Sequence, residues 1–532
     1  MKKRIILLTA LTVSAFACAP ESFKADIGNL RNDVEFLASD ECDGRRPFSE
    51  GAERASGYIA RQMEEIGLEP LSDSSFLQQV PLAMIRTKVP EAITLRTPSG
   101  PMTLERDIDF TAFTQRLDPE IDIRDAQLVF AGYGIVAPEF GKDDYRNITD
   151  PGNKIAVVIV NDPGLGSEGD YFHADAMTYY GRWTYKLEEG ARQGLKGVLI
   201  IHDDRGAGYG WDVVTAADAR YVLNDPSVQQ DACPLSGWLS KSAASELLKK
   251  AGFNPDEVFE RAKAPDFEPF SLNTALDIKL TSTFEFAESP NVVGYIPGES
   301  DECIICTAHW DHLGHASSAT DGDCIINGAT DNATGVAWLL ETARLLKGQK
   351  HRRNIVFLSP TCEEKGMHGS SFYADHPIFP ADKTVAVVNM DVIPLWGENN
   401  DVTVTGYGHS DLDSLLEEAA ARQGRYLMAD PDAFNGMFYR SDQLPFMRKG
   451  IPAVFAKGWS DNRRHGKQWA EDMIDDYWAK VYHKTCDETH PDTDDYSGLA
   501  QDVELFADLI GRLADSGFKP QWNENSEFAS AR

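Results

Sequence analysis

The sequence predicts an α/β protein: a mostly parallel, mixed sheet sandwiched by helices, with an inserted β-rich domain. From residue 290 onward, strand-like apolar runs alternate with amphipathic helical patterns, which is typical of parallel strands joined by crossover helices. Between residues 126 and 285 the apolar runs end in glycine, proline or aspartate, which favours strands with few helices. We therefore predict four segments, at 1–17, 18–125, 126–285 and 286–532.

The first segment has the pattern of a signal peptide. A basic start, KKR, precedes an apolar run from Ile5 to about Phe16, and small residues follow. No later run has the ~20 apolar residues that a membrane span requires. The sequence predicts an exported protein, periplasmic or extracellular, without a spanning helix. Two processing routes stay open: cleavage after Ala17, or lipidation of Cys18, which would anchor the chain to a membrane.

Composition argues against nucleic acid as a partner. The chain has 84 Asp and Glu against 51 Lys and Arg, a formal net charge of −33, whereas phosphate binding needs a basic surface. Its eight cysteines are scattered, which does not indicate a disulfide framework. The CIIC at 303–306 lacks the second pair of a structural zinc site. Most thiols are expected to be buried and free.

The remaining elements are expected in the following order. Residues 26–68 read as helices, with Gly67 as a C-terminal stop. Residues 18–125 otherwise supply connecting strands, as short runs from about 80. In 126–285, AQLVFAGYGIVAP, KIAVVIVNDPG and KGVLIIHDD predict strands. In 286–532, NVVGYIP, CIICTAH, NIVFLSP, TVAVVNMD and IPAVFAKG predict strands, and ATGVAWLLETARLLKG and LDSLLEEAAARQG predict helices.

Polar residues stand where the strands of the last segment are expected to end. These are His309 after CIICTAH, Glu363 and Glu364 after NIVFLSP, Asp391 after TVAVVNMD, and Asp331 just before the long helix. Ligands bind at the carboxyl ends of parallel strands, and converging unpaired carboxylates are costly to bury. A cation would offset that cost, so the pattern predicts a metal site.

The adjacent acids in FLSPTCEEKG are not expected to act as one pair. Neighbouring side chains diverge, so Glu363 and Glu364 should face different partners. One of them could face the metal while the other supports the chemistry.

Five motifs, AHWDHLG, NGATDN, TCEEKG, VNMD and VYHKTCDE, resemble in order and spacing the co-catalytic zinc aminopeptidase family, which includes glutamate carboxypeptidase, the glutaminyl cyclases and the transferrin receptor ectodomain. FYRSDQLPFMRKGIPAVF and WNENSEF resemble its larger exported bacterial members, and 126–285 resembles their protease-associated domain. The resemblance implies a zinc-exopeptidase-like fold at 286–532 and an aminopeptidase that removes residues from peptides with a free N-terminus.

The resemblance also implies two Zn²⁺ ions. Asp331 would bridge them, and its peptide bond to Asn332 would be cis. The other ligands would be His309 and Asp391 on one ion, and Glu364 and His483 on the other. Charge arithmetic agrees with this set, because three carboxylates and a bridging hydroxide balance the four positive charges of two zinc ions.

Further roles follow from the resemblance. Glu363 would be the general base that works with the metal-bridging hydroxide. Asp311 would be the carboxylate that orients the imidazole of His309, and Tyr439 would donate a hydrogen bond to the developing oxyanion.

Several neighbours of these motifs carry a weaker signal. His312 and His315 are interpreted as structural or rim residues, and Ser441 and Asp442 as structural. Where the family commonly has His after its Ser-Asp pair, this chain has Gln443, which puts any role of that His in doubt.

Three alternatives stay open on the same scaffold. A glutaminyl cyclase would use one zinc for acyl transfer inside the substrate, so zinc stoichiometry distinguishes it. A carboxypeptidase or dipeptidase would differ only in side chains around the metals. A non-catalytic ectodomain would be expected to lack ligands, and none is missing here.

Overall fold

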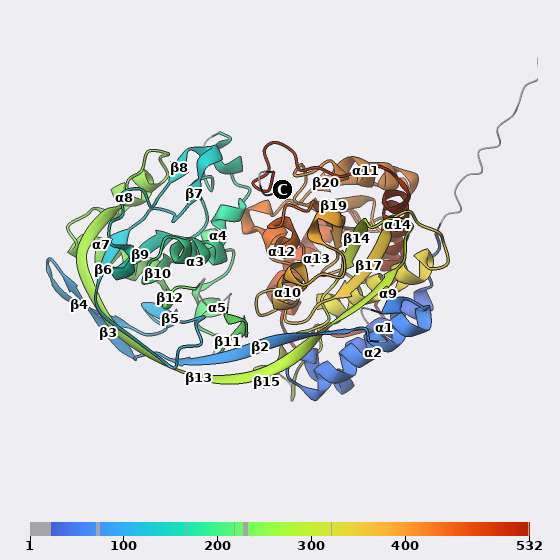
Figure 1. Ribbon diagram of the computed structural model, residues 1–532, viewed down its shortest axis with the longest axis horizontal. Coiled ribbons are helices and arrows are strands. Elements are labelled where there is room, and N and C mark those ends of the chain that lie inside the picture. Colours follow the sequence, from blue (N-terminus) through green and yellow to red (C-terminus); the bar gives the residue numbers. More distant parts are fainter. Residues whose placement is uncertain are drawn as a thin grey trace, which may run out of the picture.

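The computed structural model of the chain describes residues 23–70, 75–167, 169–216, 219–226, 232–320, 322–529 and 531. Figure 1 shows two lobes side by side, which we call the accessory lobe (left) and the main lobe (right). The predicted signal peptide at 1–17 and Cys18 lie outside the described residues. No helix of the described part has the length and apolar character needed to cross a bilayer. The seven described cysteines are free thiols, as expected, and most of them are buried.

The main lobe is built on a mixed sheet. Its neighbouring strands are, in order, β1 (Glu69–Pro70), β13 (Phe270–Ile296), β17 (Asn354–Ser359), β14 (Cys303–Thr307), β18 (Thr384–Asn389), β21 (Ala453–Lys457), β19 (Asp401–Thr405) and β20 (Tyr426–Ala429). The four strands from β17 to β21 are mutually parallel. Strand β13 runs antiparallel to β17, and β19 runs antiparallel to β21 but parallel to β20. The predicted fold class is confirmed.

Helices cover both faces of this sheet because successive strand residues point to opposite sides. Ile304 and Phe357 pack on one side with the long helices, while Ile305 and Val356 pack on the other with short ones. The first side carries α1 (Ile27–Leu37), α2 (Glu50–Ile66), α9 (Thr334–Leu346), α11 (Leu412–Arg422) and α14 (Ser497–Asp515), and the second carries α10 (His368–Asp375) and α12 (Leu444–Met447). Helix α13 (Lys467–Asp476) and the hairpin β15 (Gly314–Thr320)–β16 (Asp323–Ile326) complete the lobe.

Helix α2 shows how the predicted signals act. The Ser49 side chain accepts a hydrogen bond from the Ala52 N–H at its start, and its apolar stripe is buried against the core. Gly67 ends it in a left-handed conformation (φ 83°) that other residues adopt at a cost, which confirms the predicted stop.

The accessory lobe is rich in strands. Its strands are β3 (Ala92–Thr97), β4 (Gly100–Glu105), β5 (Phe110–Phe113), β6 (Glu120–Phe130), β7 (Val136–Ala137), β8 (Lys142–Asp143), β9 (Lys154–Ile159), β10 (Gly197–Ile201), β11 (Arg220–Leu223) and β12 (Leu235–Leu239). Its helices are α3 (Trp183–Arg192), α4 (Asp204–Ala207), α5 (Trp211–Thr215), α7 (Lys241–Lys250) and α8 (Pro255–Ala262). Strands β6, β9, β10 and β12 run parallel in that order.

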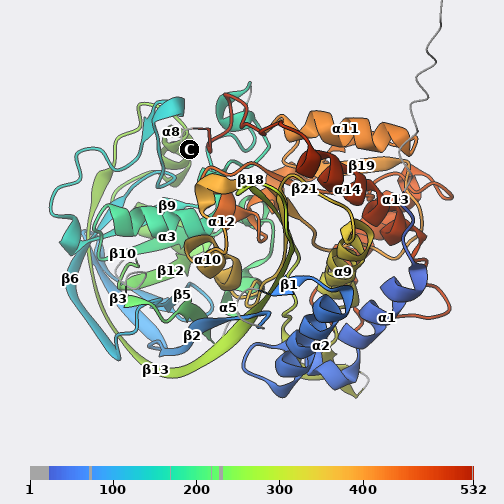
Figure 2. The same ribbon diagram turned by 45° about the vertical axis from the view of Figure 1, so that its right-hand side comes forward.

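Two long strands join the lobes. Strand β13 pairs first with β6 of the accessory lobe, then with β2 (Leu77–Lys88), and finally with β17 of the main lobe. Both views show β13 and β2 sweeping from one lobe to the other (Figure 2). The predicted boundary at 285/286 falls inside β13, and Ile93, before the predicted insertion, shares a core with Leu128 and Leu276. Packing therefore joins the accessory segment to chain on both of its sides, and the predicted division stays a prediction.

Arg45 ties the N-terminal helices to the loops that follow two strands. Its side chain is 1% exposed. Nε donates to the carbonyl of Trp310 at 2.8 Å, Nη1 to those of Leu37 and Asn327, each at 2.5 Å, and Nη2 to that of Gly328 at 2.9 Å. One guanidinium thus satisfies four buried carbonyls, which would otherwise lie away from water without a donor.

Replacement of this guanidinium should weaken the fold. We expect Arg45→Met to lower the free energy of unfolding by about 3 kcal/mol, because it leaves several buried acceptors unpaired. Urea denaturation measures the free energy of unfolding. The control is Arg54→Met on the exposed side of α2, which should stay within about 0.5 kcal/mol of the unmodified protein. Equal stabilities of the two variants would contradict the anchoring role of Arg45.

Candidate metal centre

The side chains predicted as metal ligands meet at one edge of the main sheet. Each comes from a segment next to a strand or helix end: His309 after β14, Glu364 after β17, Asp391 after β18, Asp331 in the turn before α9, and His483 after the helical turn Tyr477–Val481. Parallel strands bring their carboxyl ends to the same edge, which explains why three of these side chains converge. The Asp331–Asn332 peptide bond is cis, as expected.

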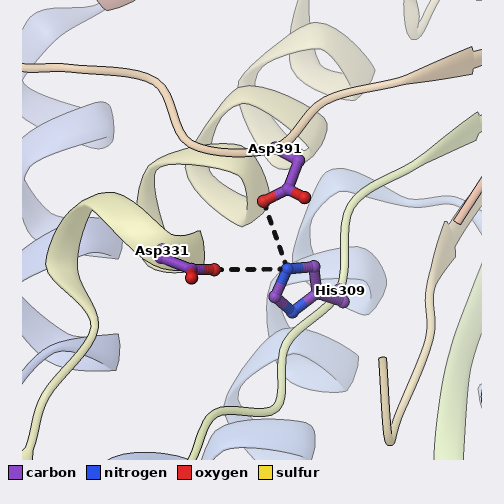
Figure 3. Close-up of side chains that lie close together, drawn as sticks. All are labelled: His309, Asp331 and Asp391. Carbon is purple, nitrogen blue, oxygen red and sulfur yellow. Dashed lines mark hydrogen bonds and ion pairs between the residues drawn. The ribbon is translucent and has the colours of Figure 1, made fainter. Parts of the chain in front are cut away.

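Asp331 lies between two histidines. Its Oδ1 is 3.4 Å from Nε2 of His309, and its Oδ2 is 3.2 Å from Nε2 of His483. A second carboxylate oxygen faces each imidazole: Asp391 Oδ1 lies 3.2 Å from His309, and Glu364 Oε2 lies 3.1 Å from His483. Figure 3 shows the first of these two groups, in which one ring nitrogen of His309 faces both aspartates. Each histidine nitrogen thus faces two carboxylate oxygens.

The donor set fits zinc. Imidazole nitrogen and carboxylate oxygen are its usual ligands. The ligand atoms of His309, Asp331 and Asp391 lie within 4.8 Å of one another, and so do those of His312, Asp331 and Glu364. His309, Asp331 and Asp391 are buried. Several carboxylates crowded away from water repel one another unless a cation compensates them. The chemistry and burial of the residues therefore fit a bound cation.

The adjacent glutamates have opposite acidities. Burial raises the pKa of Glu363 well above its ordinary range, and nearby Asp442 and Asp391 add to this, although His309 opposes it. Burial would raise the pKa of Glu364 too, but His483 and His312 hold it well below its usual value. The two carboxyls therefore face different surroundings, as their adjacency predicts, one suited to carrying a proton and the other to remaining an anion.

Asp311 acts through two neighbouring groups. Its backbone carbonyl lies 3.1 Å from Nδ1 of His309, while its carboxylate is farther away, at 3.9 Å. That carboxylate instead accepts the backbone N–H of Glu363 at 2.9 Å. Burial raises its pKa to about 7. The residue thus contacts the predicted ligand with its main chain and holds the predicted base with its side chain.

Sequence reasoning missed Asp487 as a support for the Asp331 turn. Its carboxylate accepts the backbone N–H groups of Thr330 at 2.9 Å and Asp331 at 3.1 Å, and its own carbonyl accepts from the N–H of Ala329 at 3.0 Å. The residue belongs to the VYHKTCDE motif, four positions after His483. Asp487 therefore couples the turn of one predicted ligand to the loop of another.

His312, interpreted as a structural or rim residue, does not lie at the rim. Its side chain is fully buried, and Nδ1 contacts Oε1 of Glu364. Glu364 therefore stands between two imidazoles, those of His312 and His483. By contrast, His315 is half exposed and pairs with Asp43 at 2.6 Å, away from the cluster. Both histidines follow His309 in the same loop, and the sequence has no feature that predicts which of them is buried against the cluster.

Two tyrosines differ in their surroundings. Tyr439 is buried, and its hydroxyl donates to Glu527 at 2.9 Å. Tyr482, which sequence reasoning did not single out, stacks on His483 with ring centroids 3.7 Å apart. Burial raises the pKa of Tyr482 well above 10, and the four carboxylates of the centre add to the effect. The Tyr482 ring therefore lies against a predicted ligand, and its hydroxyl remains protonated at neutral pH.

Gln443 belongs to a buried network beside the centre. Its Oε1 accepts from Nδ2 of Asn389 at 2.7 Å, and its Nε2 donates to the carbonyl of Phe438 at 2.6 Å. Asn389 also donates to Ser441 at 2.8 Å. Since Asn389 ends β18 just before Asp391, this amide supports the strand end instead of reaching the cluster.

Comparisons with known proteins agree with the motifs. Residues 291–503 match the model of peptidase family M28, which confirms the resemblance to the co-catalytic zinc family and supports zinc as the metal. The mouse (Mus musculus) aminopeptidase NAALADL1 is 32% identical over 140 residues, which cover 24% of this chain and 17% of the relative. Aminopeptidase Y of Saccharomyces cerevisiae is 25% identical over 257 residues, covering 46% and 42%. The chain thus matches less than half the length of either relative.

A solved structure extends the likeness of the fold to nearly the whole chain. The aminopeptidase from Aneurinibacillus sp. strain AM-1 matches with a TM-score of 0.51 and 19% identity, covering 93% of this chain and 95% of that chain. This similarity includes both lobes and concerns the fold alone.

The support from Asp487 leads to a test of metal affinity. We expect Asp487→Ala to weaken zinc binding about 10-fold to 100-fold, because the Asp331 turn loses two hydrogen-bond acceptors while every side chain of the cluster remains. Competition with a chromophoric chelator measures the affinity. The control is Glu488→Ala, at the exposed neighbouring position, which we expect to leave the affinity for zinc unchanged. An Asp487→Ala protein that binds zinc normally would rule out this support.

Proposed function

We propose, on the premise that residues 291–503 belong to peptidase family M28, that this chain is an exported aminopeptidase with two zinc ions, acting on peptides with a free N-terminus. One observation carries the dizinc proposal: the two oxygens of Asp331 face two different histidines, and each histidine faces one further carboxylate. The proposed export is supported by the basic and apolar pattern of residues 1–17.

The ligand assignment follows the two halves of the cluster. His309 and Asp391 would hold one ion, Glu364 and His483 the other, and Asp331 both. Zinc bound there would polarise the peptide carbonyl and lower the pKa of water from about 15.7 toward 7. The surrounding hydrogen bonds would keep these side chains in place, since Asp487 holds the turn of Asp331.

Glu363 is suited to proton transfer. Its side chain is 10% exposed, its Oε2 lies 3.9 Å from Nε2 of His309, and its main chain is fixed by Asp311. Its raised pKa lets it accept a proton from water and release it to the leaving amine. Glu364, with its low pKa, would remain an anion throughout.

Tyr482 is the better candidate for donating to the developing oxyanion. Its hydroxyl has no hydrogen-bond partner among the described residues, and it lies near the carboxylates of the centre. The role predicted for Tyr439 receives less support, because that hydroxyl already donates to Glu527. A protonated donor near the site of charge development stabilises the transition state more than the ground state.

Metal content tests the ligand assignment. We expect about two zinc ions per chain in the unmodified protein. Asp331→Ala should lose most of both ions, because this residue would bind both. His483→Ala should lose mainly one. Elemental analysis after gel filtration measures the stoichiometry, with Asp256→Ala on exposed α8 as the control. One zinc per chain in the unmodified protein would contradict the dizinc proposal and favour single-zinc chemistry.

The adjacent glutamates can be separated by isosteric changes. Glu363→Gln removes the titratable group at nearly constant shape, so we expect zinc retained, KM little changed, and kcat lowered about 10²-fold to 10⁴-fold. Glu364→Gln should instead lose zinc, because an amide is a neutral and weaker ligand. Hydrolysis of an aminoacyl fluorogenic amide and elemental analysis measure these effects.

The control for this pair is Glu417→Gln, at an exposed position of α11. It should leave zinc and rate unchanged. A Glu363→Gln protein that keeps both its zinc and most of its rate would overturn the assignment of the base.

A further inference from the structure

The imidazole of His312 is held in place by the main chain around it. Its backbone N–H donates to the carbonyl of Arg45 at 3.2 Å, and its side chain is fully buried. The ring lies against Gly328, where a Cβ would come within 2.5 Å of the ring carbon Cδ2. Gly328 has a φ of 61° and directly precedes the turn that carries Asp331. The absence of a side chain at this glycine therefore gives the ring its place beside a predicted ligand.

The two ring nitrogens of His312 have different surroundings. Nδ1 contacts Oε1 of Glu364, whereas Nε2 is buried and has no hydrogen-bond partner among the described residues. The ring stands edge-on to that of His483, with ring centres 5.7 Å apart and 69° between the ring planes. The polar contact of this imidazole with the cluster therefore runs through Nδ1.

The two oxygens of Glu364 also have different partners. Oε1 meets His312, while Oε2 lies 3.1 Å from Nε2 of His483, which is itself 3.2 Å from Oδ2 of Asp331. A carboxylate that binds zinc must be an anion, so it accepts hydrogen bonds and cannot donate them. We therefore assign the proton in the first contact to Nδ1 of His312.

Direct binding of a metal by His312 is the alternative. Its ligand atom lies within 4.8 Å of those of Asp331 and Glu364, which is close enough for one cation to contact all three. A ligand nitrogen needs a free lone pair, however, and an unprotonated Nδ1 would turn that lone pair toward the lone pairs of Oε1. Since such an arrangement is repulsive, the observed contact favours a donor at Nδ1.

We propose that His312 is a positioning residue, which binds Oε1 of Glu364 and leaves only Oε2 for the zinc ion assigned to Glu364 and His483. The inference rests on the ligand assignment of the proposed function and adds a residue to it. Ligating carboxylates are generally fixed by such hydrogen bonds. With single atoms from Asp331, Glu364 and His483, this ion has three protein ligands, and the fourth position of a tetrahedral zinc stays open for water or substrate.

Two amide side chains test which ring nitrogen matters. His312→Asn places an N–H donor close to the position of Nδ1, whereas His312→Gln places its amide nearer to Nε2, which has no partner within the described residues. We expect His312→Asn to bind both zinc ions nearly as tightly as the unmodified protein does. His312→Gln should bind one of the two about 10-fold to 100-fold more weakly. Competition with a chromophoric chelator measures the affinities, and elemental analysis measures the number of ions.

A third variant separates positioning from the other roles. His312→Phe keeps a ring beside Gly328 and removes both nitrogens, so it should weaken the same ion as His312→Gln does. If the ring only filled space, His312→Phe would bind zinc best and His312→Asn worst. If His312 were itself a ligand, His312→Asn and His312→Gln would lose the ion equally. Either result would overturn the positioning role.

The matched control is His315→Gln. His315 lies in the same loop, is half exposed and pairs with Asp43 at 2.6 Å, so its replacement should leave both affinities unchanged. Circular dichroism of the metal-free proteins shows which variants fold. Because His312→Gln and His312→Phe both lack a donor at the Nδ1 position, either of them that folds can be compared with His312→Asn.

Metal content separates this inference from the proposed function. If Glu364→Gln keeps both zinc ions, the ligand assignment is wrong, and the role of His312 is overturned with it. If Glu364→Gln loses an ion while His312→Gln and His312→Phe bind both as tightly as His312→Asn, only the positioning role is overturned. Hydrolysis does not enter these measurements, so a protein that cleaves no peptide would contradict the peptidase proposal alone.

Discussion

The structure depends on a single carboxylate shared between two imidazoles. Asp331 faces His309 with one oxygen and His483 with the other, and each imidazole faces one more acid. Such a group is costly to bury without a cation, because like charges repel and water is excluded. These carboxylates lie at the carboxyl ends of the parallel strands, where loops from distant parts of the chain meet.

That arrangement requires rigid loops, and the supports come from outside the cluster. Arg45 binds the carbonyls of the loops around Trp310 and Gly328, and Asp487 binds the N–H groups of the Asp331 turn. Asn332 adds a third link, donating from Nδ2 to the carbonyl of Met390 at 3.0 Å. Ligand positions therefore depend on hydrogen bonds that Arg45, Asp487 and Asn332 make one layer away from the cluster.

Much of the fold and of the candidate site could be predicted from the sequence. The features that could not be predicted depend on contacts between distant parts of the chain. Strand runs such as CIICTAH and NIVFLSP are continuous and apolar because both faces of the sheet are covered, so their ends, and with them His309 and Glu363, are visible in the sequence. The burial of His312, by contrast, depends on where Glu364 points, and the support from Asp487 depends on a turn more than 150 residues earlier in the chain. Strand β13 hides the division of the lobes, because it has no break where the predicted boundary falls.

The adjacent glutamates show how one loop can hold two carboxyl groups whose pKa values are shifted in opposite directions. Both side chains are largely removed from water, so desolvation acts on each in the same direction. What differs is the partner: carboxylates crowd Glu363, whereas two imidazoles flank Glu364. In this loop the neighbouring side chains set the local charge, and carboxylates that lack a compensating neighbour within the described residues mark where a proton or a metal completes the arrangement.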